Sequence, residues 1–187
     1  MGRKAIVAAA AALTLSCGSP APGGTAAEEG AATAPGSLPG DLESILYDGF
    51  QLSWTPEGDS ILVTMSAPTT GWIAAGFHSG GAMNDAQIVI GWVDGREVRI
   101  RDDFGTGFTT HAADTTLGGT DDLVLISGTE QNGRTTITFR MPLDSGDDND
   151  RKLVPGEPCR AVLAYGNDGD DSFTGYHAWA GSTDIEI

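Results

Sequence analysis

Short runs in which hydrophobic and polar residues alternate dominate the chain beyond residue 45. The clearest run is 60–67, in which Ile61, Val63 and Met65 are each separated by a single residue. A period of two residues is typical of a β-strand with one buried face. No stretch keeps a helical apolar period for three turns, so the pattern predicts an all-β chain. The other predicted strands are 50–54, 72–77, 86–93, 97–102, 122–129, 135–141, 161–165 and 183–187.

Turn signals separate these predicted strands. Residues 56–59 read Pro-Glu-Gly-Asp, and Asp94-Gly95 and Asn132-Gly133 have the composition of two-residue hairpin turns. The 27 glycines and 9 prolines of the chain divide it into short segments. Short strands joined by tight turns favour an antiparallel β-sandwich.

The first 17 residues resemble an export signal rather than part of a fold. Arg3 and Lys4 precede the apolar run 5–15, which is shorter than the roughly 20 residues that a membrane span needs. Ser16-Cys17 then resembles the end of a bacterial lipoprotein signal, in which Cys17 becomes the lipidated N-terminus. The alternative is an ordinary secretory signal with an incidental cysteine. In either case we expect export. With a lipoprotein signal, we expect the protein to be held at the membrane surface.

Composition divides the remaining chain into a tether and one domain. Residues 18–40 contain almost no bulky apolar side chain, which predicts a flexible linker, and 41–187 has the length of one domain. The chain holds 10 basic and 26 acidic residues, a net charge of −16 that falls to −18 without Arg3 and Lys4. This charge excludes nucleic acid as a partner and favours basic protein partners. Within the domain Cys159 stands alone, so no internal disulfide is expected.

Two residues in glycine-flanked loops are candidates for holding a metal. Met83 lies in Gly-Gly-Ala-Met-Asn-Asp and His177 in Gly-Tyr-His-Ala-Trp. A thioether and an imidazole together hold iron in electron-transfer haem proteins. The chain has no Cys-x-x-Cys-His motif, so any haem would be bound without covalent links. The two residues are 94 positions apart, and only tertiary folding can bring them together.

Several separated motifs resemble one family. They are Gly-Trp-Ile-Ala-Ala-Gly-Phe at 71–77, Asp-Ala at 85–86, Ile-Gly-Trp-Val-Asp-Gly at 90–95, Arg-Met-Pro-Leu-Asp-Ser-Gly-Asp at 140–147, Ala-Tyr-Gly at 164–166 and Tyr176-His177. In this order, over residues 45–187, they resemble a DOMON domain, and specifically its haem-binding branch, to which the cytochrome domain of cellobiose dehydrogenase belongs. The resemblance implies an immunoglobulin-like antiparallel β-sandwich that binds one haem b. It also implies that Met83 and His177 are the axial ligands of the iron.

A b-type cytochrome domain that transfers single electrons between redox partners outside the cytoplasm is therefore the expected function. The aromatic residues near the two loops are candidates for the haem wall, namely Trp72, Phe77, Trp92, Tyr176 and Trp179. His78 is the substitute ligand should His177 not bind iron, whereas His111 lies in a polar connection and is expected to be exposed. We expect the chain not to be an enzyme, because it contains none of the common hydrolase, metalloprotease or nucleotide-binding motifs.

Two other functions stay open from the sequence. Other branches of the family lack haem, so a haem-free module for a carbohydrate or a partner protein is the first. The acidic runs 144–150 and 167–171 offer hard oxygen ligands for calcium, although neither matches an EF-hand loop. A solvated acidic loop is the simpler interpretation of both runs.

Overall fold

The structure is a computed structural model that describes residues 42–187. The predicted signal peptide, Cys17 and the linker 18–40 lie outside the described residues. Within 42–187 no helix is long and apolar enough to cross a membrane. The elements in chain order are β1 (Glu43–Tyr47), β2 (Phe50–Glu57), β3 (Ser60–Ala67), β4 (Ile73–Phe77), β5 (Gln87–Asp94), β6 (Glu97–Gly107), β7 (Thr110–Ala113), α1 (Asp114–Leu117), β8 (Val124–Gln131), β9 (Arg134–Pro142), β10 (Pro158–Gly166) and β11 (His177–Glu186).

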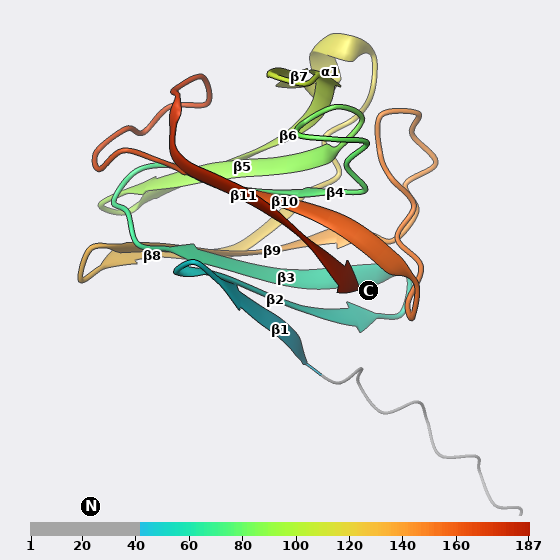
Figure 1. Cartoon of the computed structure of the whole chain (residues 1–187), viewed down its shortest axis with the longest axis horizontal. Helices are drawn as coiled ribbons and strands as arrows, with labels where there is room; N and C mark the ends of the chain where they lie inside the picture. The colour runs from blue at the N-terminus through green and yellow to red at the C-terminus, as the bar shows by residue number, and fades with distance from the viewer. Residues whose placement is uncertain (1–41) are drawn as a thin grey trace, which may run out of the picture. The chain divides into compact units, whose positions relative to one another are not determined.

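Two antiparallel sheets pack face to face. A five-stranded sheet has the order β1-β2-β3-β9-β8, and a six-stranded sheet has the order β11-β10-β4-β5-β6-β7. Figure 1 shows them as two layers, with β3 and β9 in one and β4, β5 and β10 in the other. The predicted β-sandwich is therefore confirmed.

Inward-facing side chains of both sheets form the inter-sheet core. Every second residue of β9 is buried, and Ile137, Phe139 and Met141 lie opposite residues of the six-stranded sheet such as Ile73 and Phe77. Fully excluding such side chains from water contributes about 1.5–3 kcal/mol each, the main favourable term in folding. Cys159 lies in this core, and burial raises the pKa of its thiol despite an opposing hydrogen bond from the His78 backbone. Cys159 is therefore a protonated packing residue rather than a nucleophile.

The predicted hairpin turns are present in the structure, and one of them lies one residue later in the chain than predicted. Asn132 and Gly133 connect β8 to β9 with positive φ values of 54° and 71°, the conformation that a type I′ turn requires. The β5–β6 hairpin turns at Gly95-Arg96, one residue later than Asp94-Gly95. The structure adds β1, β7 and α1, which the alternation pattern did not reveal, and it extends the last predicted strand back to His177.

Candidate functional site

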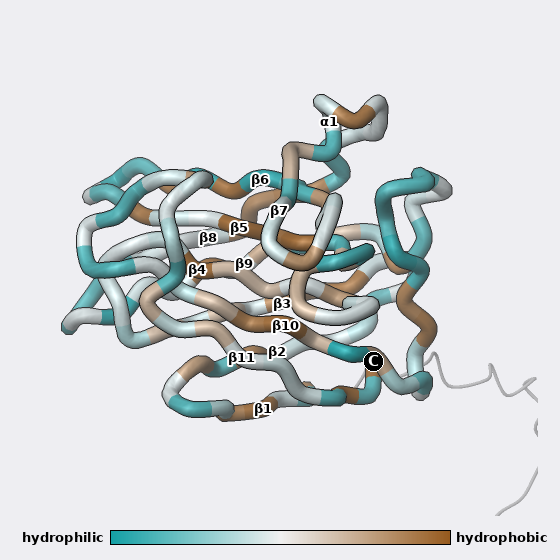
Figure 2. Tube along the Cα trace, turned by 45° about the horizontal axis from the view of Figure 1, so that its top comes forward, coloured by the Kyte–Doolittle hydropathy of each residue, from teal (hydrophilic) through white to brown (hydrophobic). Residues whose placement is uncertain are grey.

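The outer face of the six-stranded sheet carries a second apolar cluster, separate from the inter-sheet core. Strand β5 is buried on both faces, because Val89 and Val93 point into the inter-sheet core while Ile88 and Ile90 point outward. Figure 2 shows hydrophobic positions along both β5 and β10. The other members of this outer cluster are Trp72, Ala74 and Ala86, with Met83, Trp92, Val162, Ala164 and Phe173 partly buried against them. An apolar face outside the core of a sandwich marks a binding surface or a covered site.

A pocket of about 580 Å³ is hollowed over this outer face. Its volume lies in the range of about 300–1,000 Å³ that small-molecule and cofactor sites occupy. Its floor is formed by Trp72, just before β4, and by Ala74, Gly76, Ile88, Ile90, Val162 and Ala164 of β4, β5 and β10. Met83, Phe108 and Tyr176 from loops, His111 from β7 and His177 from β11 also line it. Met83 and His177 thus line the same pocket, although they come from distant parts of the chain.

Backbone contacts seat the loop that carries Met83. Asp85 N donates to Gly105 O at 3.0 Å, and Gly105 N donates to Ala86 O at 2.9 Å. The loop folds back on itself, since Ala86 N donates to Met83 O at 3.1 Å. Gly105 permits this close approach, because a Cβ at that position would collide with the Met83 carbonyl group. The thioether is therefore held on a fixed loop rather than on a free one.

A β-bulge turns His177 toward the pocket. The ladder between β10 and β11 shifts register at its end, so that Ala178 is an extra residue on β11. Trp179 packs against the inter-sheet core, whereas Ala180 lines the pocket. Strict alternation would place His177 on the core side with Trp179, and the extra residue returns it to the pocket side. The His177 side chain is exposed, and its ring makes no hydrogen bond with residues 42–187.

The five aromatic residues predicted to form a wall occupy three different places. Trp72 and Tyr176 line the pocket, and Tyr176 is 92% exposed at its rim. Trp92 belongs to the outer cluster and packs on Phe173, without reaching the pocket itself. Phe77 and Trp179 do not face the pocket: both pack in or against the inter-sheet core. They were assigned by nearness in sequence, which does not fix the face of a strand on which a side chain lies.

The Trp72 ring lines the pocket, but its Nε1 atom lies against Gly166, where an added Cβ would collide with it. The Nε1 atom is buried and has no hydrogen-bond partner among the described residues. A buried N–H without a partner costs free energy. The pocket therefore offers an apolar floor, and the Trp72 N–H is not accessible from it.

A buried ion-pair network places a second imidazole in the pocket, which the sequence did not reveal. Asp103 is inaccessible to solvent and accepts hydrogen bonds from Arg101 Nε at 2.5 Å and Arg101 Nη2 at 2.7 Å. His111 Nδ1 lies 2.5 Å from Asp103 Oδ2, the same oxygen that accepts from Arg101 Nη2. His111 was predicted to be exposed, but it belongs to β7 and lines the pocket. The sequence contained one indication of this network. Arg101 and Asp103 lie two residues apart on one strand, so their side chains lie on the same face.

The substitution Asp103→Asn is expected to destabilise the domain by about 1–3 kcal/mol, because it leaves Arg101 and His111 without their anionic partner. Urea unfolding followed by tryptophan fluorescence measures the loss. Glu97→Gln on the same strand is the matched control. Its ion pair with Arg99 is exposed and should contribute less than about 1 kcal/mol. Equal losses for the two variants would contradict a structural role for the buried network.

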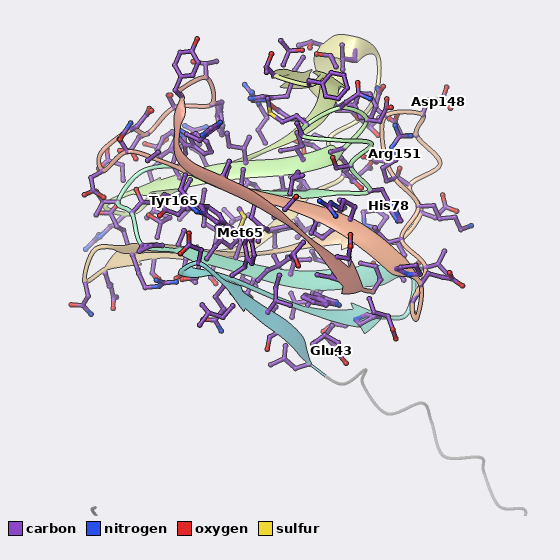
Figure 3. All side chains as sticks on the ribbon, viewed as in Figure 1. Glu43, Met65, His78, Asp148, Arg151 and Tyr165 are labelled. Carbon is purple, nitrogen blue, oxygen red and sulfur yellow. The ribbon has the colours of Figure 1, made fainter. Side chains whose placement is uncertain are left out.

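The substitute ligand, His78, lies away from the pocket. Its backbone N–H donates to Cys159 Sγ at 3.3 Å, and its ring lies on the Arg151 side of the molecule, as Figure 3 shows. Burial lowers the pKa of His78, the charge of Arg151 lowers it further, and a hydrogen bond to the Lys152 backbone opposes this. The structure brings His111 and His177 to the pocket with Met83, but not His78.

Comparison with known proteins places this fold and pocket in a family. Residues 46–166 match the DOMON domain. The chain belongs to the DOMON family. This DOMON domain is 28% identical over 120 residues to MOXD1 homolog 2 of Drosophila melanogaster, and 28% identical over 116 residues to DBH-like monooxygenase protein 1 of Homo sapiens. The alignments cover 64% and 62% of this chain but only 16% and 18% of the relatives, so the chain spans less than a fifth of their length.

Solved structures show the same fold. The DOMON domain has a TM-score of 0.57 and 18% identity to the cytochrome b domain of pyranose dehydrogenase from Coprinopsis cinerea, with 78% of this chain and 81% of that chain covered. The TM-score is 0.54, at 10% identity and the same coverage, for the cytochrome domain of cellobiose dehydrogenase from Myriococcum thermophilum. These likenesses show the sandwich architecture. The family match itself contains Met83 and ends before His177.

Proposed function

We propose that this DOMON domain binds one non-covalent haem b in the outer-face pocket and transfers single electrons between redox partners outside the cytoplasm. The observation that carries the proposal is that Met83 and His177, 94 residues apart, line one pocket. The cytochrome domains that share the fold support it by analogy. The monooxygenase activity in the names of the longer relatives is not part of the proposal.

The residues of the pocket fit such a group. Met83 offers a soft thioether and His177 an imidazole, a pair that suits haem iron and leaves it no open position. Ile88, Ile90 and Val162 give an apolar floor that excludes water from one face of a flat macrocycle. Haem supplies a one-electron couple when bound, and the chain's own part is to hold, orient and shield it.

The edge of the pocket is polar, and it contains the Arg101 side chain that is paired with Asp103. A smaller hollow of about 230 Å³ is lined by Arg101 and Phe173 and shares Thr109 and His111 with the main pocket. The Arg101 guanidinium group lies 4.5 Å above the Phe173 ring. A ligand with an apolar body and carboxylate groups at one end would place those groups beside Arg101 and His111.

We infer the kind of redox partner from the charge of the domain, and its location from the N-terminal segment. An acidic surface favours encounter with a basic redox partner, at a rate that falls as salt rises. Lipidation at Cys17 would hold the domain at the membrane surface through the linker 18–40. Both statements concern how the domain meets its partners rather than how it holds haem.

A haem-free binding module is the second candidate function. The specific observation in its favour is Tyr176, whose side chain is 92% exposed beside the pocket. An exposed aromatic ring at a pocket rim suits the face of a sugar or a planar ligand.

The absorption spectrum of the purified, haem-reconstituted protein tests the proposal. We expect a low-spin reduced spectrum with one haem per chain. Met83→Ala and His177→Ala should each abolish the low-spin bands and weaken haem affinity by more than about tenfold. His78→Ala is the matched control and should leave the spectrum unchanged, since His78 lies outside the pocket. Absence of haem uptake by the folded protein would refute the proposal and favour the second candidate.

His111→Ala distinguishes the two imidazoles of the pocket. Because Asp103 fixes the Nδ1 side of His111, this variant should retain the low-spin spectrum if His177 is the ligand. Loss of the bands in His111→Ala, with a normal spectrum in His177→Ala, would move the ligand to His111. A carboxylate on the second ring nitrogen is a common feature of metal-bound histidines, which makes this comparison necessary.

A further inference from the structure

Two carboxyl groups are buried without basic partners at the end of the sandwich where β6 meets α1. Asp102 points from β6 toward the inter-sheet side and is 2% exposed, and Asp114 begins α1 and is 1% exposed. All four of their carboxylate oxygens are buried and make no hydrogen bond of good geometry within the described chain. The Asp122 backbone lies near Asp102 and the Asn149 side chain near Asp114, and each partly lowers the pKa of its neighbour. Burying a carboxylate is costly unless it is paired or bound to a metal. The outer-face pocket uses neither residue.

Further carboxylates surround these two from other segments. A Cβ at Gly119 would collide with Oδ2 of both Asp114 and Asp147, so these two oxygens both lie close beside Gly119. Asp147 belongs to the β9–β10 loop, and Thr120 N donates to its Oδ2 at 2.8 Å. Figure 1 shows α1 and this loop, drawn in orange, at the same end of the sandwich. Three separate segments therefore bring acidic side chains to the same end of the sandwich.

The charges of this cluster are not balanced by basic side chains. Among residues 42–187, no ion pair includes Asp102, Asp114, Asp122, Asp147 or Asp150. The two basic residues of the β9–β10 loop pair elsewhere, Arg151 with Asp85 and Lys152 with Asp144.

The electrostatics of the cluster follow from burial and like charge. Burial, followed by the charges of Asp150, Asp114 and Asp121, raises the pKa of Asp102 to about 8. Burial and the charge of Asp147 raise the pKa of Asp114 to about 6, although Asn149 opposes the shift. A divalent cation would remove this repulsion and allow both groups to ionise.

We propose that Asp102, Asp114 and Asp147 bind a calcium ion between β6, α1 and the β9–β10 loop. All donors are hard oxygens, and calcium accepts six to eight of them in flexible geometry. Asp122 and Asp150 are close enough to complete the set, although Asp150 already accepts hydrogen bonds from Gln87 and Ser145. Within the described residues no three acidic, imidazole or thiol groups already surround a point at ligand distances. Binding would therefore draw the β9–β10 loop onto the two buried carboxylates.

The other acidic run, 167–171, does not share these features. Asp168 accepts a hydrogen bond from Thr70 N at 3.0 Å, and Asp170 accepts one from Ser172 Oγ at 2.7 Å. Both carboxylates therefore have partners. The calcium site is accordingly assigned to the cluster around Asp102 alone, and it does not depend on haem binding.

Thermal unfolding of the haem-free protein in chelator and in calcium, at matched ionic strength, tests the site. At a calcium concentration about a hundredfold above Kd, the Tm of the wild type should rise by about 5 °C or more. Isothermal titration should give one calcium ion per chain. Asp102→Asn and Asp114→Asn should each reduce the Tm shift below about 1 °C. In chelator, Asp102→Asn should melt no lower than wild type, because a neutral amide avoids the cost of burying an ionisable carboxyl group among like charges.

Asp148→Asn is the matched control. Asp148 is exposed in the same β9–β10 loop, as Figure 3 shows, and the substitution removes the same charge. It should keep the full calcium shift. The proposal is overturned if wild type shows no shift, or if Asp102→Asn and Asp114→Asn shift as much as Asp148→Asn does. Should one of these variants fail to fold, the other and the wild-type titration still decide between these outcomes.

Discussion

Replacing Gly105 with alanine is expected to unseat the loop that carries Met83. The new Cβ would collide with the carbonyl group of Met83 and lie 3.2 Å from Ala86 N, and these backbone atoms have little freedom to move. Such overpacking costs about 1–3 kcal/mol. Because the loop is displaced, haem affinity should fall by more than about tenfold, as in Met83→Ala. Urea unfolding and haem titration measure the two effects.

Gly107→Ala provides the control for this loop. Its Cβ would meet only the Thr110 Oγ1 atom, at 3.0 Å, and a hydroxyl group can rotate away. We expect a near-normal unfolding midpoint and near-normal haem uptake. If Gly105→Ala behaved like Gly107→Ala, the contact between Gly105 and the Met83 loop would have no bearing on the site.

Phe139→Ala should produce the largest loss of stability among single core substitutions. Phe139 is completely buried on β9, between β3 and β8 in the five-stranded sheet. Truncating a buried phenylalanine costs about 3–5 kcal/mol, which combines the lost transfer free energy with the cavity left behind. The midpoint of urea unfolding should fall accordingly. Below that midpoint the haem spectrum should be unchanged, since Phe139 does not reach the outer-face pocket.

Phe108→Ala should show the reverse behaviour. Phe108 is 68% exposed and lines the pocket, so its removal should change stability by less than about 0.5 kcal/mol. Haem affinity should nevertheless decrease, because the side chain covers one side of the pocket. A large stability loss in Phe108→Ala, or an altered spectrum in folded Phe139→Ala, would show that core and pocket are coupled.

Strands with one clear buried face were predictable from the sequence. The elements that were missed lack such a face or are too short to show one. β3 matches its prediction at both ends, because its inner residues alternate without interruption. β7 was missed, since Thr110 and His111 belong to a short polar strand whose burial depends on neighbouring loops. α1 has four residues, fewer than an apolar helical period needs in order to be visible.

The candidate site was predictable only in part, for a similar reason. Met83 and His177 were identified by residue type and by family motifs, and they line one pocket. Phe77 and Trp179 were assigned to the same pocket, but side-chain direction in a strand follows parity, and a single bulge reverses it. The contribution of His111 depends on Asp103, eight residues earlier in the chain, and only the pairing of β6 with β7 brings the two side chains together.

The extra residue at Ala178 has a consequence for comparing relatives of this domain. In a relative that keeps the histidine but lacks the additional position, strict alternation would turn the imidazole ring toward the interior of the sandwich. A one-residue deletion would thus remove a potential iron ligand while leaving the Tyr-His pair intact in an alignment. If His177 holds haem as proposed, the number of residues between that histidine and the tryptophan that follows it is a sharper criterion for haem-binding members than the presence of the histidine alone.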